Sequence, residues 1–529
     1  MYQYVLKNAT IADGTGAALY CGDICIQDGK ISAILPAYQG PAEQILDVSG
    51  LITAPGFIDI HTHSDCVLFQ KGANPESKLY QGVTLEMIGN CGISNLPAPK
   101  AHKEELTRFY NAFIPATLEY TSLDDSSVSD YAKRLNEARP AANYGVLIGH
   151  GTLRGAVMGF DMRHPTPLEQ EQMEQLLAKQ LEEGAFGMSL GLIYPPSSFA
   201  RAEELIGLGK VLAAHHAILA VHMRSESAGV FEAVEEMLHV AEMSGVHLEI
   251  SHLKLMGKAQ WGKTDRLLSM LAQARARGVR VTCDQYPYHA SSTGLSALAP
   301  GWAHDGGVAC LTERAKHPTE QLLDAVAAEM DRRGGPEAVM VVDTNHRLPE
   351  IHGMTMDVIA RQWQMDPAQA VLRCLALCDS TVACIYFSMS MEDVCQIMQD
   401  MNISVGSDGV GYEYVQVAEK GLHPRNFGTF PRFLQTVRER KLMPVEQAVY
   451  KMTGLPASVL GIKDRGIIRE GMVADLTIFD PEKVADRSTF MKSAVKPAGI
   501  CHVIVAGQLA LTNGEQTDAR AGGILLHTP

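Results

Sequence analysis

Two histidines separated by one residue follow an apolar segment near the start of the chain. Residues 57–60 (FIDI) read as a strand that leads into His61 and His63. Side chains alternate between the two faces of a strand, so both imidazoles point to the same side at its carboxyl end. Two imidazoles on one side have the geometry of a metal chelate. Because His-x-His also occurs by chance, a metal site requires ligands from other parts of the chain.

Three further strand-like segments end in residues of the same chemical kinds. His222 ends the segment LAVH, His252 ends ISH, and Asp408 ends GSD. Imidazoles and carboxylates are common ligands of zinc and related metals. These residues lie far apart in the sequence, so they form a site only where the fold brings the carboxyl ends of their strands together.

Cys91 lies in the segment GNCG after another strand-like run. Most free cysteines are small buried apolar residues, and we assign the other ten to that role. A thiolate at a strand end beside imidazoles is instead a typical zinc ligand. His150 also follows a strand-like run, where a structural role and a ligand role compete.

A parallel barrel would position these residues, because all of its strands end on one face. Apolar strand-sized runs alternate with stretches of helical period through the middle of the chain, as in repeated βα units. We therefore predict an α/β fold with a (β/α)₈ TIM-type barrel. Its strand candidates are residues 55–60, 83–88, 144–149, 185–190, 217–222, 247–252, 280–286 and 403–407.

The stretch 287–402 is too long for one crossover and contains further strand candidates at 339–342 and 384–387. The identity of the seventh barrel strand therefore stays open. We expect residues 289–345 to form a lid inserted into the barrel.

The two ends of the chain differ from its middle in their sequence pattern. They contain short β-rich runs separated by turn residues such as Asp28-Gly29 and Asn513-Gly514. We expect residues 1–55 and 465–529 to form one small β-sandwich. The barrel with the candidate metal ligands would then occupy residues 56–464.

Composition limits the class of partner. The chain has 45 Lys and Arg against 60 Asp and Glu, a net charge of −15, without the clustered basic residues that hold nucleic acid or an anionic membrane. We expect a small-molecule partner. The cysteines are odd in number and unpaired in pattern, the first residues resemble no signal peptide, and no long apolar run is present. These features favour a cytoplasmic protein without a membrane span.

Several motifs together resemble one known family. The segments GFIDIHTHSD, GNCG, HMRSE, ISHLK, YPY, GSDG, HPRNFGTFPR and MTGLPA are similar to the D-aminoacylase branch, the N-acyl-D-amino-acid deacylases, of the amidohydrolase superfamily. The similarity extends from about residue 5 to 510. A histidine pair with a terminal aspartate indicates only the superfamily, whereas Cys91 indicates the branch.

The resemblance implies a zinc enzyme that hydrolyses N-acyl-D-amino acids. Cys91, His222 and His252 would hold zinc tightly. His61, His63 and Asp408 would form a second, weaker position that shares Cys91, and Asp408 would act as general base and then acid.

The resemblance also implies a clamp for the substrate's α-carboxylate, formed by Lys254, Tyr286, Ser292 and Arg425. Relatives that prefer acidic substrates carry an arginine in the stretch that corresponds to residues 295–302. This chain has none there, so we expect neutral or apolar substrate side chains to pack against Leu295, Leu298 and Trp302.

Two alternatives remain at this point. A cyclic-amide hydrolase of the dihydroorotase or hydantoinase kind shares the barrel and the metals. A non-enzymatic scaffold descended from an amidohydrolase would have lost some ligands, but every expected ligand is present. The residues do not reveal the acyl group, the oligomeric state or, without the resemblance, the chirality of the substrate.

Overall fold

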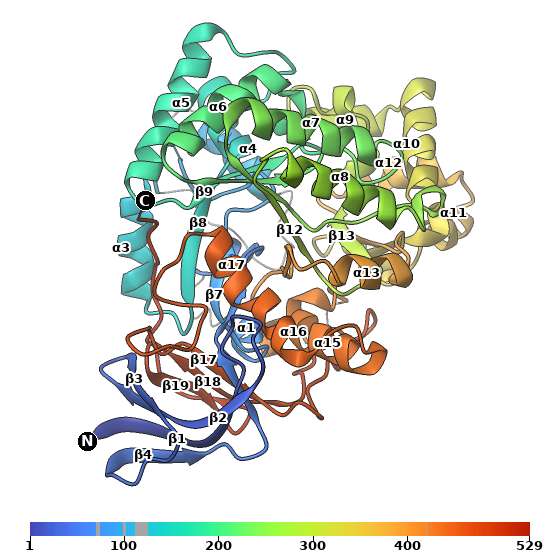
Figure 1. The fold of residues 1–529 in the computed structure, drawn as a ribbon. Helices are drawn as coiled ribbons and strands as arrows, with labels where there is room; N and C mark the ends of the chain where they lie inside the picture. Colours follow the sequence, from blue (N-terminus) through green and yellow to red (C-terminus); the bar gives the residue numbers. More distant parts are fainter. Residues whose placement is uncertain (70–74, 99–101, 112–124, 419–420, 529) are drawn as a thin grey trace.

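An eight-stranded parallel sheet forms the centre of the protein (Figure 1). The computed structural model describes residues 1–69, 75–98, 102–111, 125–418 and 421–528. Along the sheet the strands are β6 (Phe57–Asp59), β7 (Val83–Ile88), β8 (Asn143–Gly149), β9 (Gly187–Gly191), β10 (Ile218–His222), β11 (His247–Ile250), β12 (Val281–Gln285) and β16 (Ile403–Val405). The predicted barrel strands are confirmed, and the segment at 280–286 is the seventh of them.

The first predicted strand is divided between two sheets. Residues 55–60 were expected to form one strand, but β5 (Ile52–Pro55) ends at Pro55 and β6 begins two residues later. Gly56 separates them, and a Cβ atom at Gly56 would lie 2.1 Å from the hydroxyl of Thr84. The chain therefore passes from the terminal sheet into the barrel at a point where only glycine fits.

The barrel is closed by the residues that follow its first and last strands. Thr62 and Gly409 form a parallel bridge. The amide of Asp408 donates to the carbonyl of His61 at 2.8 Å, and the amide of His63 donates to the carbonyl of Gly409 at 2.8 Å. Three of the predicted site residues therefore lie in the seam that closes the barrel.

A buried ion pair supports this seam. Lys78, in α1 (Glu76–Leu79), is fully buried, and its ammonium group donates to Asp59 Oδ2 at 2.8 Å and to the hydroxyl of Ser407. Asp59 also accepts from the amide of Ser407 at 2.8 Å. The pair connects β6 to the residue before Asp408.

Helices cover the outside of the barrel. They include α2 (Lys103–Asn111), α3 (Val128–Ala138), α4 (His150–Met158), α5 (Pro167–Glu182), α6 (Ala202–Ala214), α7 (Val230–Ser244), α8 (Thr264–Ala276), α13 (Met391–Met398), α14 (Tyr414–Val417), α15 (Arg425–Arg440), α16 (Val445–Met452) and α17 (Gly454–Val459). Apolar faces such as Met173, Leu177 and Leu181 of α5 pack into the same buried cluster as the strands.

A second small sheet with four helices lies between β12 and β16. Its strands, in the order β13 (Ser291–Gly294), β15 (Ala383–Tyr386) and β14 (Val339–Asp343), are antiparallel. The helices are α9 (Val308–Lys316), α10 (Glu320–Arg332), α11 (Met356–Trp363) and α12 (Pro367–Leu377). Because β15 completes this sheet, the insertion continues beyond residue 345, where the lid was expected to end.

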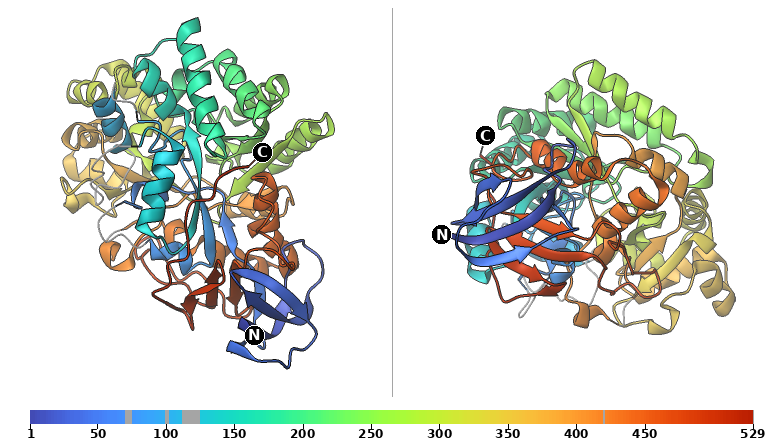
Figure 2. Two further views of the ribbon diagram at one scale, coloured as in Figure 1. Left: turned by 90° about the vertical axis from the view of Figure 1, so that its left-hand side faces the viewer. Right: turned by 60° about the horizontal axis from the view of Figure 1, so that its bottom comes forward.

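Both ends of the chain share a nine-stranded sheet on another side of the barrel (Figure 2). Its strands are β1 (Tyr2–Ile11), β2 (Tyr20–Gln27), β3 (Lys30–Leu35), β4 (Ala42–Asp47), β5, β17 (Leu476–Phe479), β18 (Ile500–Val505), β19 (Gln508–Thr512) and β20 (Glu515–Gln516). Ile26, Leu476 and Ile504 share one buried cluster. The two halves are thus one continuous sheet folded over a common core, and the domain boundaries at 55 and 465 stay a proposal.

None of the helices in the described part of the chain is both long enough and apolar enough to cross a lipid bilayer.

Replacing Lys78 with Met should destabilise the protein by about 3–5 kcal/mol, because it leaves the Asp59 carboxylate buried without its cation. The midpoint of urea unfolding, followed by circular dichroism, measures the effect. Lys133→Met, an exposed lysine on α3, serves as the control and should unfold with the wild type. A Lys78→Met midpoint equal to that of the wild type would show that the ion pair does not stabilise the seam.

Candidate metal centre

Six predicted ligands converge at the carboxyl ends of the barrel strands. His61 and His63 follow β6, Cys91 follows β7, His222 ends β10, His252 follows β11 and Asp408 follows β16. Their ligand atoms form two overlapping groups, and within each group all of the atoms lie within 4.8 Å of one another. Side chains up to 347 residues apart in the sequence thus share one site, as expected for a barrel.

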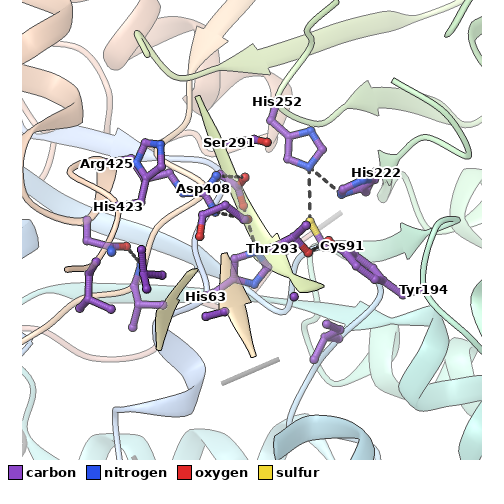
Figure 3. Close-up of a pocket in the computed structure, with 18 of the residues that line it drawn as sticks. His63, Cys91, Tyr194, His222, His252, Ser291, Thr293, Asp408, His423 and Arg425 are labelled. Carbon is purple, nitrogen blue, oxygen red and sulfur yellow. Dashed lines mark hydrogen bonds and ion pairs between the residues drawn. The ribbon is translucent and has the colours of Figure 1, made fainter. Parts of the chain in front are cut away.

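One group consists of Cys91, His222 and His252 (Figure 3). The thiol Sγ lies 3.6 Å from His252 Nε2, and His252 Nε2 lies 2.9 Å from His222 Nδ1. All three residues are buried. A thiolate with two imidazoles, placed so that each presents a donor atom to the others, fits a zinc ion.

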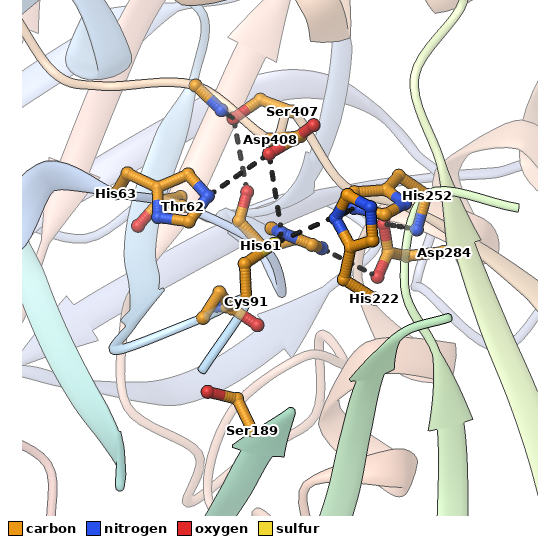
Figure 4. A network of polar contacts seen from close by, with 12 residues as sticks. His61, Thr62, His63, Cys91, Ser189, His222, His252, Asp284, Ser407 and Asp408 are labelled. Atoms are coloured by element: carbon orange, nitrogen blue, oxygen red, sulfur yellow. Dashed lines mark hydrogen bonds and ion pairs between the residues drawn. The ribbon is translucent and has the colours of Figure 1, made fainter. Parts of the chain in front are cut away.

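The other group consists of His61, His63, Cys91 and Asp408 (Figure 4). Asp408 Oδ1 lies 3.1 Å from His63 Nε2 and 3.4 Å from His61 Nε2. Cys91 Sγ lies 3.3 Å from His61 Nε2. Cys91 belongs to both groups, so its sulfur stands between the two possible metal positions.

The backbone at three of these ligands adopts the left-handed conformation. The φ angles are +52° at Cys91, +39° at His252 and +51° at Asp408. Residues other than glycine seldom adopt this conformation, and it is concentrated at functional sites. Glycine is required at position 89, two residues before Cys91. Its φ is +79°, and a Cβ atom there would lie 2.0 Å from the carbonyl oxygen of Leu147.

Neighbouring cationic groups lower the pKa values of Cys91 and Asp408. Burial disfavours ionisation of Cys91, but the imidazoles of His61, His222 and His252 outweigh it and hold the pKa of the thiol well below its ordinary value. Burial opposes ionisation of Asp408 as well, and Arg425, His252 and His61 keep the pKa of this carboxyl well below its usual range. The site is thus built for a thiolate and a carboxylate, which are the ionised forms that bind metals.

Two carboxylates orient the histidines from behind. Asp284 Oδ2 lies 3.1 Å from His61 Nδ1. Glu226 Oε1 lies 3.0 Å from His252 Nδ1, and its other oxygen lies 3.6 Å from His222 Nε2. Such partners fix the direction of an imidazole ligand and raise its basicity. Sequence reasoning did not assign either residue, although Glu226 belongs to the HMRSE motif.

His150 has a structural role. It is fully buried at the start of α4, and its two ring nitrogens lie 2.9 Å from the hydroxyl of Ser197 and 2.9 Å from Glu204 Oε1. Both nitrogens are therefore engaged, and His150 belongs to neither ligand group.

A cavity of about 150 Å³ opens over the ligands. Lys254, Tyr286, Ser292 and Arg425, the predicted clamp, all line it. The ring of Tyr286 lies near both cations, with its centre 5.6 Å from Lys254 Nζ and 5.1 Å from the guanidinium carbon of Arg425. Lys254 pairs with Glu226 at 2.5 Å, and Arg425 pairs with Asp408 at 2.6 Å.

Ser292 takes part through its main chain. Its carbonyl accepts from Arg425 Nη2 at 3.1 Å. Its neighbours Ser291 and Thr293 lie around the cavity next to the ligands (Figure 3), and Thr293 Oγ1 lies 2.8 Å from the hydroxyl of Tyr194. Ser292 lines the same cavity as these two residues, and its role in binding the substrate stays a prediction.

The expected side-chain pocket at residues 295–302 does not coincide with the cavity over the ligands. Leu295 and Leu298 are fully buried in the core of the insertion, and Trp302 is 37% exposed. None of the three lines the cavity over the ligands. Residues 295–298 form a 3₁₀ turn after β13, which directs these side chains into the insertion.

The family model described as "Amidohydrolase family" matches residues 44–373 and 400–510. Among curated proteins, an N-acyl-D-glutamate deacylase of Alcaligenes xylosoxydans xylosoxydans is 36% identical over 95% of this chain and 92% of its own length.

Two solved structures extend this likeness to three dimensions. An N-acyl-D-glutamate deacylase from Bordetella bronchiseptica, complexed with zinc and a phosphonate inhibitor that mimics the tetrahedral intermediate, has a TM-score of 0.83 and 35% identity, covering 99% of this chain and 100% of that one. A D-aminoacylase described as having a binuclear metal centre has a TM-score of 0.83 and 32% identity, with both chains covered completely. The chain therefore belongs to the amidohydrolase family and, within that superfamily, to the branch of D-aminoacylases and N-acyl-D-amino-acid deacylases, which are enzymes that act on linear amides.

Proposed function

We propose that the protein hydrolyses the amide bond of N-acyl-D-amino acids with the help of zinc, releasing a carboxylate and the free D-amino acid. The observation that carries this proposal is the position of Cys91, whose sulfur belongs to two ligand groups at the base of a cavity lined by cations. Relatives that cover nearly the whole chain bear the names of such deacylases.

Cys91, His222 and His252 would hold the tight zinc ion. The site offers a soft thiolate and two imidazoles, a donor set that zinc favours. His61, His63 and Asp408 would form a weaker position that shares Cys91. When bound, zinc lowers the pKa of a coordinated water to about 7 and polarises a carbonyl group.

Asp408 would act as the general base and then as the general acid. It lines the cavity, and Arg425 and His63 hold its two oxygens at 2.6 and 3.1 Å. A carboxylate fixed in this way can accept the proton of the attacking water and return it to the leaving amine. The returned proton is needed because an amine anion is a poor leaving group.

Lys254, Tyr286 and Arg425 would hold the α-carboxylate of the substrate. Two cations close to one phenol ring line the same cavity, and such charged donors suit a carboxylate. Ser292 would contribute through its backbone carbonyl by holding Arg425. The carboxylate would thereby fix the amide relative to Asp408.

The cyclic-amide alternative differs in the group that the cavity must bind. A hydantoin carries no free carboxylate, so it would leave Lys254 and Arg425 paired only with the protein's own Glu226 and Asp408. The cavity therefore favours an N-acyl amino acid over a hydantoin. The preference for neutral side chains loses its structural basis, because residues 295–302 do not line the cavity.

A substrate panel tests the proposed function. The zinc-loaded protein should hydrolyse N-acetyl-D-amino acids with a much higher kcat/KM than their L-enantiomers or hydantoins, measured by release of the free amine. Preference for hydantoins would instead support a cyclic-amide hydrolase. Purified protein that neither binds zinc nor cleaves any member of the panel would support the scaffold alternative.

Replacing Cys91 with Ala should abolish tight zinc binding and activity, because the sulfur belongs to both ligand groups. Metal content after dialysis and turnover are the two measurements. Cys283→Ala is the matched control, since Cys283 is a fully buried thiol in β12 outside both groups. It should keep its zinc. One tightly bound zinc per chain and normal turnover in the Cys91 variant would refute the assignment.

Asp408→Asn should keep the fold and the tight zinc but lower kcat by about 10²- to 10⁴-fold, the usual contribution of a positioned acid and base. Asp343→Asn provides the control, because this carboxylate lines the same cavity but belongs to neither ligand group. A nearly normal kcat in Asp408→Asn would remove Asp408 from catalysis. Loss of the tight zinc would make Asp408 a principal ligand.

A further inference from the structure

A third cation lines the cavity, from a part of the chain that the motifs do not include. Arg333 directly follows α10 and is 8% exposed, and it lies among the lining residues together with Glu226 and Thr293. Its guanidinium reaches the segment after β13, where Nη2 donates to the carbonyl of Ala297 at 3.3 Å. The cation that residues 295–302 lack is therefore supplied by α10.

Two of the three guanidinium nitrogens of Arg333, Nε and Nη2, donate hydrogen bonds to the protein. Nε donates to Glu329 Oε1 at 2.8 Å, and the ring centre of Tyr386 lies 5.2 Å from the guanidinium carbon. The remaining nitrogen, Nη1, makes no hydrogen bond to any residue that the structure describes. A buried guanidinium with an unused donor at a cavity wall is placed to bind an anion or a carbonyl oxygen.

Glu329 does not cancel the charge of Arg333. Its other oxygen, Oε2, accepts from Arg332 at 2.8 Å. One carboxylate thus serves two guanidinium groups, so the three side chains together carry one positive charge. Glu329 is not among the residues that line the cavity. It holds Arg333 from outside and leaves the cavity side available.

Arg333 is separate from the two cations of the clamp. Lys254 Nζ and the guanidinium carbon of Arg425 lie 5.6 and 5.1 Å from the ring centre of Tyr286, where the proposed function places the α-carboxylate, and each cation is paired with a carboxylate of the cavity, Glu226 or Asp408. Arg333 is carried by the insertion, and the Nη1 donor that its own partners leave unused is a further point at which the cavity can hold an anionic group.

We propose that Arg333 binds a carboxylate on the substrate's side chain, so that the preferred substrates are N-acyl derivatives of acidic D-amino acids. This inference rests on the proposed function. The side chain is favoured over the acyl group because Arg333 and Glu226 line the same cavity, and Glu226 is the partner of Lys254 in the clamp. The side chain and the α-carboxylate leave the same carbon atom, whereas the acyl group lies beyond the scissile bond.

Isosteric substrates and two variants of Arg333 test the proposal. In the wild type, kcat/KM for N-acetyl-D-glutamate and N-acetyl-D-aspartate should exceed that for N-acetyl-D-glutamine and N-acetyl-D-asparagine by about tenfold or more. Arg333→Met should lower kcat/KM for the acidic pair by about a hundredfold and change that for the amides little. Arg333→Lys should recover part of the loss.

Arg332→Met is the matched control. Arg332 makes the same contact with Glu329, but its side chain is 47% exposed and it does not line the cavity. It should keep the preference for acidic substrates.

Four results would overturn the proposal. Equal kcat/KM values for acidic and amide substrates in the wild type would show that no cation of the protein binds the carboxylate of the substrate's side chain. An equal loss for both kinds of substrate in Arg333→Met would make Arg333 a structural residue. Dependence of N-succinyl-D-leucine, rather than N-acetyl-D-glutamate, on Arg333 would place the acyl group there. Cleavage of none of these substrates by the wild type would refute the proposed function itself, and the Arg333 proposal with it.

Discussion

The site depends on the contact between one buried thiol and imidazoles from three different strands. A thiolate is costly to bury alone, and imidazoles are costly to protonate in an apolar interior. Brought together, they compensate one another, and this is why the pKa of Cys91 lies well below its ordinary value. The unusual backbone at Cys91 and His252, and the glycines around Cys91, follow from the need to bring these groups within reach.

The same region also completes the barrel. The backbone bonds between Asp408 and His61, and between His63 and Gly409, join the first strand to the last. Lys78 and Asp59 lie directly beneath this seam. The position of Asp408 is therefore determined both by the backbone bonds that close the barrel and by the contacts of its own side chain.

Sequence reasoning found the parts of the site that follow from strand geometry. His61, Cys91, His222, His252 and Asp408 each stand at the end of an apolar run, and a barrel places such ends on one face. The structure brings all of them together.

The residues that were missed obey weaker rules. Glu226 and Arg333 lie outside the strand ends, in segments where a charge is more often solvated than functional. On β13, Ser291 and Thr293 line the cavity beside the predicted Ser292, and the sequence pattern alone offered no reason to choose among the three. The insertion extends beyond the predicted residue 345, because its third strand, β15, begins nearly forty residues after β14 ends. Strand pairing over that distance leaves no local pattern in the sequence.

The insertion between β12 and β16 separates the residues around the cavity into two structural groups. The metal ligands belong to the barrel, whereas Ser291, Thr293 and Arg333 belong to the inserted sheet and its helices. Mutations in the insertion can therefore alter the surroundings of a bound molecule while the thiol and imidazoles stay in place. The choice of the bound molecule and the chemistry done on it would thus be carried by separate parts of the chain.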